Sequence, residues 1–289
     1  MATRVLKTLN QILPELRYEP TAKWIRAFSK GSPVLDTKEA VLLWEPMRAT
    51  PIYAVPSSDV LAELLKSSAQ PQPVVGARML FPDDAFLMHT ANGTIWDVRV
   101  ADQVLEGAAF SFTDPELADY VEFDFQAFDW FEEEELLFAH ARDAFHRIDV
   151  RSSTRHVRVE LNGVLLAETP TPEVLFETML PPRYYLPHDS VVWDQLQPTA
   201  SSSMCPYKGK ANCWKARDTE TEVAWSYAEP VRGMERLAEL VCFYNERVDL
   251  LIDGVVAPRP QTPFGQLAHG RFRPIRARTS ERDTYKERS

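Results

Sequence analysis

The stretch HVRVELNGVLLAE (156–168) contains the β-hairpin pattern that sets the fold class. Apolar and polar residues alternate in HVRVEL, as in a strand with one buried face. Asn162-Gly163 is typical of a tight two-residue turn, and VLLAE forms the returning strand. ANCWKAR and EVAWSY predict a second hairpin around DTET (218–221). We therefore predict a mainly β chain, although apolar spacing near 3.6 predicts a short helix within MERLAELVCFY (234–244) before another strand in RVDLLIDG.

Two regions of the chain share one pattern, which indicates an internal duplication. RYYLPHDSV (183–191) matches IYAVPSSDV (52–60), and EVAWSYAEP (222–230) matches GAAFSFTDP (107–115) in the same order. Ordered matches of this kind predict two copies of one domain. We expect five segments: an N-terminal extension (1–19), a degenerate first repeat (20–136), a linker (137–146), a second repeat (147–256) and a C-terminal tail (257–289).

The second half resembles the family known as domain of unknown function 427, on the segments RYYLPHDSV, CPYKGKANCW, AWSYAEP and FYNERVDLLIDG. The first half resembles the same family weakly, and the tandem layout is similar to two-domain bacterial members. The resemblance implies two tandem β-tent-like domains of curved antiparallel sheets, an architecture shared with B-type methionine sulfoxide reductases. Those relatives bind zinc through paired cysteine motifs that this chain lacks, so we expect no metal and no cofactor.

Composition limits the possible classes of protein. The 289 residues are 45% hydrophobic and 26% charged, as in a globular protein, and apolar runs fall short of a membrane span. The N-terminus lacks the pattern of a secretory signal, and the three cysteines indicate reduced thiols, so we expect a cytoplasmic protein. A net charge of −10 argues against a nucleic-acid surface.

Acidic residues concentrate in residues 114–135, which hold ten Asp and Glu and no Lys or Arg. The simpler interpretation is a solvated acidic face. The alternative is a docking surface for a basic protein partner.

The segment CPYKG (205–209) is the candidate site, because it gathers a thiol, a phenol, an amine and a glycine. Cys205 is a candidate nucleophile assisted by Lys208, or else a small buried residue. Lys208 is expected to bind an anion. Tyr207 would contact a ligand or fill the core, and Gly209 would supply a positive φ or a close backbone approach.

Alignment of Trp96 with Trp214 places residues 87–91 (LMHTA) opposite CPYKG. The scaffold residues match across the repeat while the reactive residues do not. This difference favours a functional second repeat supported by a degenerate first one.

Aromatic and basic residues surround the predicted turn. Trp225 and Tyr227 stand two apart on one strand, so they share a face and line either a pocket wall or the core. Arg183 and Tyr184 are expected to support the same pocket. In the linker, His140, Asp143 and His146 have an unspecific metal-like spacing, and we favour hydrogen bonds between the halves over a metal.

Three functions follow from these patterns. We favour a small-molecule-binding protein or enzyme whose second repeat holds an anionic or aromatic metabolite. Its candidate catalytic residues are Cys205 and Lys208. The alternatives are a non-catalytic interaction module that docks through 114–135, and the nucleotidyltransferase-like activity with which the family has been labelled.

Overall fold

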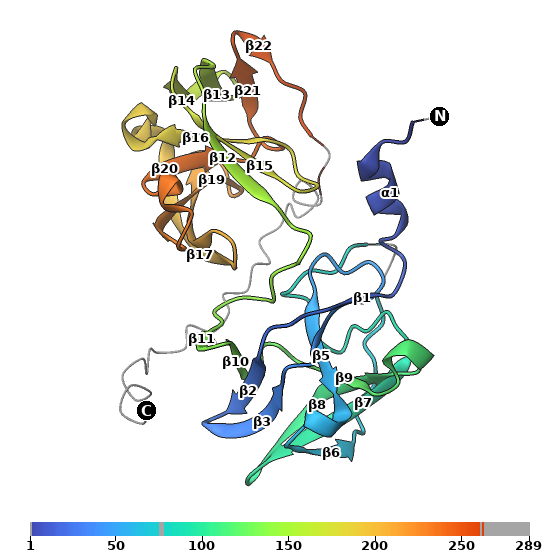
Figure 1. The fold of residues 1–289 in the computed structure, drawn as a ribbon. Coiled ribbons are helices and arrows are strands. Elements are labelled where there is room, and N and C mark those ends of the chain that lie inside the picture. The colour runs from blue at the N-terminus through green and yellow to red at the C-terminus, as the bar shows by residue number, and fades with distance from the viewer. Residues whose placement is uncertain (1, 75–77, 261, 263–289) are drawn as a thin grey trace.

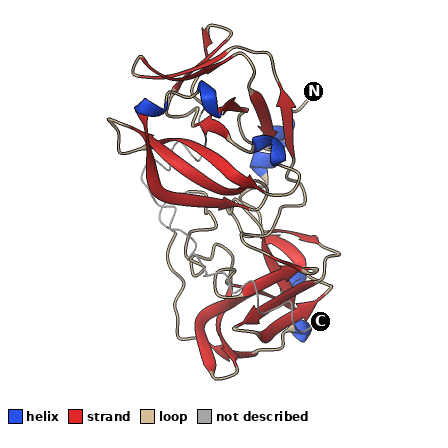
Figure 2. Ribbon diagram, turned by 90° about the vertical axis from the view of Figure 1, so that its left-hand side faces the viewer, coloured by secondary structure: helices blue, strands red, loops and turns tan. Residues whose placement is uncertain are grey.

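The computed structural model describes residues 2–74, 78–260 and 262, and strands dominate it (Figures 1 and 2). The strands form four sheets in two successive halves, and every pairing between named strands is antiparallel. The mainly β fold class expected from the sequence is confirmed. In the part of the chain that is described, no helix is long and apolar enough to cross a membrane.

The first half follows one short α-helix, α1 (Val5–Gln11). Its strands are β1 (Arg17–Pro20), β2 (Ile25–Ser29), β3 (Ser32–Thr37), β4 (Val41–Trp44), β5 (Ile52–Pro56), β6 (Glu63–Lys66), β7 (Gly93–Val100), β8 (Gln103–Phe112), β9 (Tyr120–Phe123), β10 (Asp129–Glu132) and β11 (Glu135–Leu136). Two 3-10 turns, η1 (Ser57–Asp59) and η2 (Pro115–Leu117), lie between strands.

The second half repeats this series. Its strands are β12 (Ile148–Ser152), β13 (Val157–Leu161), β14 (Val164–Thr169), β15 (Glu173–Glu177), β16 (Arg183–Pro187), β17 (Leu196–Cys205), β18 (Gly209–Ala216), β19 (Glu222–Pro230), β20 (Leu240–Phe243), β21 (Asp249–Ile252) and β22 (Val255–Val256). Its 3-10 turns are η3 (His188–Ser190), η4 (Trp193–Gln195) and η5 (Glu235–Leu237). The expected tail (257–289) lies outside the described residues beyond 260, apart from Thr262.

The two halves have the same strand order. The seven-stranded sheets run β1-β4-β5-β9-β8-β7-β6 and β12-β15-β16-β20-β19-β18-β17. The four-stranded sheets run β3-β2-β10-β11 and β14-β13-β21-β22. Each strand of the first half therefore has a counterpart in the second, and residues can be compared through their pairing register.

The hairpin predicted at 156–168 is β13–β14. Asn162 and Gly163 take φ values of 51° and 79°, as a two-residue turn with two positive φ angles requires. The predicted hairpin around 218–221 is β18–β19. The helix predicted within 234–244 is wrong in extent, because only the 3-10 turn η5 forms. Glu239 then takes a φ of 60°, which ends the helical path before β20.

Each half has two apolar layers. One fills the space between the two sheets, with Trp130 and Phe123 in the first half and Val159 and Phe243 in the second. The other covers the outer face of the seven-stranded sheet. Because side chains alternate along a strand, the residue between two core residues points to that outer face. Glu122 is such a residue in β9, since Val121 and Phe123 face the core between the sheets.

We predict that Gly209→Ala destabilises the protein by about 2–3 kcal/mol. Gly209 has a φ of 113°, and a Cβ there would lie 2.9 Å from the carbonyl oxygen of Glu229. Gly163→Ala is the matched control, because Gly163 also has a positive φ but no heavy atom within 4 Å of the added carbon. Gly163→Ala should lower the unfolding free energy by only about 1 kcal/mol. Urea unfolding of both variants tests this, and equal losses would contradict it.

Candidate functional site

The CPYKG segment is the tight turn between β17 and β18. Cys205 pairs with Gly209, and the Lys208 amide donates to the Cys205 carbonyl oxygen at 3.3 Å. Gly209 has the positive φ expected from the sequence and packs closely against the backbone of β19. Cys205 is half-buried at the end of β17. The turn therefore fixes the backbone that carries the candidate residues.

Lys208 forms a buried ion pair with Glu177, the last residue of β15. Its Nζ lies 2.8 Å from Oε1 and 2.6 Å from Oε2 of the carboxylate. Burial works to raise the pKa of Glu177, but the positive charge of Lys208 and hydrogen bonds from His146 and Lys208 lower it to about 2. Burial likewise works to lower the pKa of Lys208, and the negative charges of Cys205 and Glu177 raise it instead. An anionic ligand would have to compete with Glu177 for this ammonium.

Cys205 lies close enough to Lys208 and to two buried phenols to affect their pKa values. Burial raises the pKa of Tyr227 and Tyr185, and the negative form of the Cys205 thiol raises both further. The other two thiols differ from Cys205. Burial raises the pKa of Cys213 to about 12 and raises that of Cys242 as well. Cys205 is therefore the thiol that combines partial exposure with a fixed cation beside it.

The linker closes over the same turn. The Arg142 guanidinium donates to the Pro206 carbonyl oxygen at 2.7 and 3.1 Å, and the Asp143 amide donates to the Tyr207 hydroxyl at 2.5 Å. His146 lies against the Tyr207 ring, with centroids 4.5 Å apart, and its Nε2 lies 2.9 Å from Glu177 Oε1. Asp143 and His146 thus make the hydrogen bonds expected of the linker, whereas His140 Nδ1 contacts the carbonyl oxygen of its neighbour Ala141.

The expected aromatic wall is part of the outer apolar layer. Trp225 and Tyr227 share one face as predicted, with exposures of 9% and 4%, so they pack rather than line an open surface. Arg183 lies on the same face, where it pairs bidentately with Glu246 at 2.8 Å and stands 5.6 Å from the Trp225 ring. Tyr184 points the other way, into the core between the sheets, because it alternates with Arg183 along β16.

Sequence reasoning missed Glu177, which is the partner of Lys208. The two residues are thirty-one positions apart, and only the pairing of β15 within the sheet brings the carboxylate under the turn. The available signal for this partner was VLFE (174–177), in which a glutamate ends an apolar strand.

The acidic segment 114–135 is distributed over η2, β9 and β10. Glu132 pairs with Lys23, Glu134 pairs with Arg26, and Glu122 is buried. Glu133 is exposed in the turn before β11, and Glu135 is exposed as the first residue of β11. Several of its charges are thus already matched within the first half, and docking through this segment stays a prediction.

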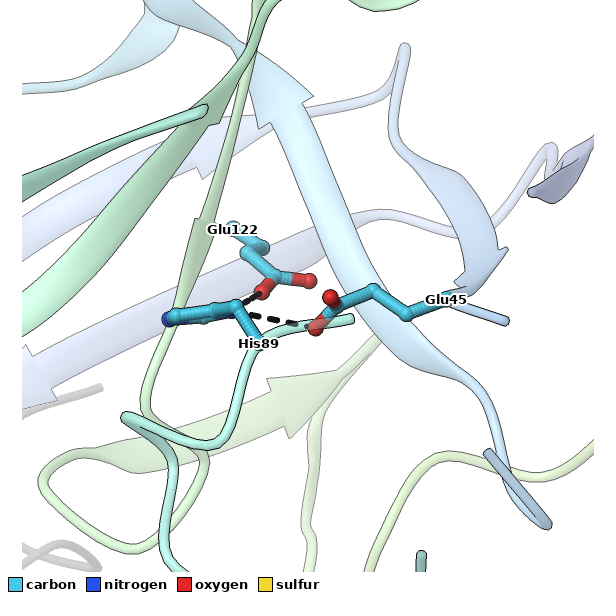
Figure 3. Close-up of side chains that lie close together, drawn as sticks. All are labelled: Glu45, His89 and Glu122. Atoms are coloured by element: carbon cyan, nitrogen blue, oxygen red, sulfur yellow. Dashed lines mark hydrogen bonds and ion pairs between the residues drawn. The ribbon is translucent and has the colours of Figure 1, made fainter. Parts of the chain in front are cut away.

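One group of side chains in the described residues has the arrangement of metal ligands, and it lies in the first half. Glu45, His89 and Glu122 bring their ligand atoms within 4.8 Å of one another (Figure 3). The register of the two seven-stranded sheets makes Glu45 the counterpart of Glu177, and Glu122 the counterpart of Cys242. His89 likewise corresponds to Tyr207. The sequence analysis expected no metal and did not single out these residues.

Residues 149–254 match the family NTP_transf_9, described as a domain of unknown function (DUF427). The match confirms the resemblance expected for the second half and stops short of the first. No curated protein matches the chain. The matched range includes the CPYKG turn, and the family description names no activity.

We predict that Lys208→Met destabilises the protein by about 3–5 kcal/mol, because it leaves Glu177 buried without its cation. Adding Glu177→Gln should restore most of that loss, since the buried charge is removed with its partner. Lys210→Met is the matched control. Lys210 is exposed at the start of β18, next to the turn, so this variant should lose no more than about 0.5 kcal/mol of unfolding free energy. Unfolding in urea tests all three, and a double variant as unstable as the single one would contradict the pairing.

The buried linker histidine predicts a pH dependence. Burial lowers the pKa of His140 from 6.5 to about 4. The folded state thus binds a proton less readily than the unfolded state, so the stability contributed by neutral His140 is complete above pH 6.5 and falls as the pH drops toward about 4. Through this residue, the unfolding free energy of the parent should fall by about 2 kcal/mol between about pH 7 and pH 5. His140→Asn should flatten the measured slope, and an unchanged slope would refute the assignment.

Proposed function

We propose that the second half is a small-molecule site centred on Cys205, and that the chain is an enzyme using this thiol as its nucleophile. The observation that carries the proposal is the half-buried thiol beside a buried ammonium that Glu177 holds in place. A fixed positive charge stabilises the thiolate, which is the reactive form of cysteine. Cys213 and Cys242 lack the exposure, because both are buried.

The reaction class is thiolate attack on an electrophilic carbon. Cys205 loses its proton to solvent, its sulfur forms a bond to the carbon, and the leaving group departs with the electron pair of the bond that breaks. Lys208 stays protonated throughout and stabilises negative charge at the sulfur. Glu177 and His146 position Lys208 and the turn, so they are positioning residues in this scheme.

The ligand is a small metabolite that reaches the turn beside the linker. Trp225 and Tyr227 support the sheet beneath it from the apolar layer. Since the charge of Lys208 is matched by Glu177, an electrophile without a strong negative charge fits better than the anion expected from the sequence. An aromatic electrophile also fits this class, and its ring would contact the Tyr207 ring at the turn.

We also propose that the halves are tandem copies of one domain, with the first supporting the second. The shared strand order and pairing register support this proposal. In the first half the turn residues are replaced by Leu87, Met88 and His89, which carry no thiol. Nucleotidyl transfer, the activity in the family label, is the alternative, and it would require nucleotide turnover dependent on a metal.

Native alkylation with iodoacetamide tests the role of Cys205. We expect Cys205 to be modified first, while Cys213 and Cys242 react only after unfolding, because both are buried. Lys208→Met should slow the reaction of Cys205 roughly fivefold to tenfold, since it removes the cation that favours the thiolate and leaves the Glu177 carboxylate. Adding Glu177→Gln removes that carboxylate as well and should restore part of the rate. Peptide mass spectrometry over time measures each site.

Lys210→Met is the control for this experiment as well, and it should leave the rate unchanged. An unmodified Cys205 in the native protein, or a rate that ignores the loss of Lys208, would overturn the nucleophile. Turnover of a nucleotide with a divalent metal would favour the alternative instead.

A further inference from the structure

We propose that Glu45, His89 and Glu122 bind one divalent transition-metal ion in the first half, a site separate from the thiol site of the second half. Figure 3 shows the Nδ1 edge of the His89 ring directed at both carboxylates. Nδ1 lies 3.0 Å from Glu45 Oε1 and 3.2 Å from Glu122 Oε1. Ligands of one ion at metal distances of about 2.1 Å stand about 3.0–3.4 Å apart, so these spacings fit.

Glu122 supplies an observation independent of this clustering. It is 1% exposed on the outer face of β9, its Oε1 lies 3.2 Å from His89 Nδ1, and its Oε2 has no hydrogen-bond partner among the described residues. An ionised carboxylate buried in this way is costly unless a cation compensates it. The Glu122 carboxylate points into the group formed with Glu45 and His89 (Figure 3).

Comparison with the second half shows that the two halves balance their buried carboxylates with different groups. There, Lys208 neutralises Glu177 and the neighbouring position is the uncharged Cys242. In the first half the counterpart of Lys208 is Thr90, and the counterpart of Cys242 is Glu122. Arg48 offsets one carboxylate, with its Nε 3.1 Å from Glu45 Oε1. A neutral His89 therefore leaves one negative charge in excess.

The proposed ligands are held in place by their surroundings. The Thr90 and Ala91 amides donate to Glu45 Oε2 at 2.6 and 2.8 Å, which leaves Oε1 facing His89. The His89 ring stacks on Phe110, with centroids 3.7 Å apart. The two amide bonds to Glu45 are outer contacts of the kind that orient metal ligands, whereas His89 Nε2 has no hydrogen-bond partner among the described residues. Thr90 and Ala91 also line a surface depression, so this loop faces solvent on its other side.

The ligand set selects the class of metal. One imidazole and two carboxylates suit Zn²⁺, Mn²⁺, Fe²⁺ or Co²⁺, whereas Mg²⁺ and Ca²⁺ prefer sets made of oxygen alone. Three protein ligands leave a coordination position for water. The competing explanation is that a protonated His89 serves as the cation between the two carboxylates.

Titration of the full chain with Co²⁺, after removal of metals with a chelator, tests the proposal. We expect one equivalent per chain, with visible absorption of bound Co²⁺, and competition by Zn²⁺ but not by Mg²⁺. Glu122→Gln should weaken binding by more than the roughly tenfold to hundredfold loss that follows a change in outer contacts alone. His89→Phe should do the same, and circular dichroism confirms that each variant is folded.

Glu116→Gln and His156→Gln are matched controls, since they alter an exposed carboxylate and an exposed imidazole. Both should bind Co²⁺ as the parent does. Absence of stoichiometric binding in the parent would overturn the proposal, as would binding that persists in folded Glu122→Gln or His89→Phe. A Glu122→Gln variant more stable than the parent, with no Co²⁺ bound by either, would assign the role of cation to protonated His89.

Discussion

A carboxylate buried on the outer face of a sheet is the constraint on which the second half depends. Glu177 ends β15 in a position where water does not solvate it, so a cation has to reach it. Lys208 does so only because the Cys205–Gly209 turn is tight enough to direct its side chain inward. The same turn presents Tyr207 to the linker. The conformation of the turn and the docking of the linker thus both depend on one ion pair.

The first half meets the same requirement with different residues. Glu45 occupies the position of Glu177 but relies on Arg48, His89 and two backbone amides. The chain therefore keeps a carboxylate at this point of both sheets while the group that balances it changes. The two halves thus share a strand order and a buried carboxylate but differ in the groups that surround it.

The sequence predicted features that are local along the chain. The alternation in HVRVEL, the turn at Asn162-Gly163 and the positive φ of Gly209 each follow from a few adjacent residues. The partner of Lys208 and the group around His89 could not be predicted, since they join strands and loops that meet only through the sheet order. Tyr184 shows the converse limit. The sequence predicts that Tyr184 and Arg183 point to opposite faces of their strand, but it does not predict which of the two faces packs against the core between the sheets.

The anchoring of the linker has a mechanical consequence. Ala141 is fully buried in the core of the first half, and the next residue, Arg142, is bonded to Pro206 of the second. Asp143 then bonds Tyr207 through its backbone amide, so only a short stretch of backbone separates the attachments to the two halves. They should tumble together as one stiff body, and a force applied at one half is transmitted directly to the CPYKG turn of the other.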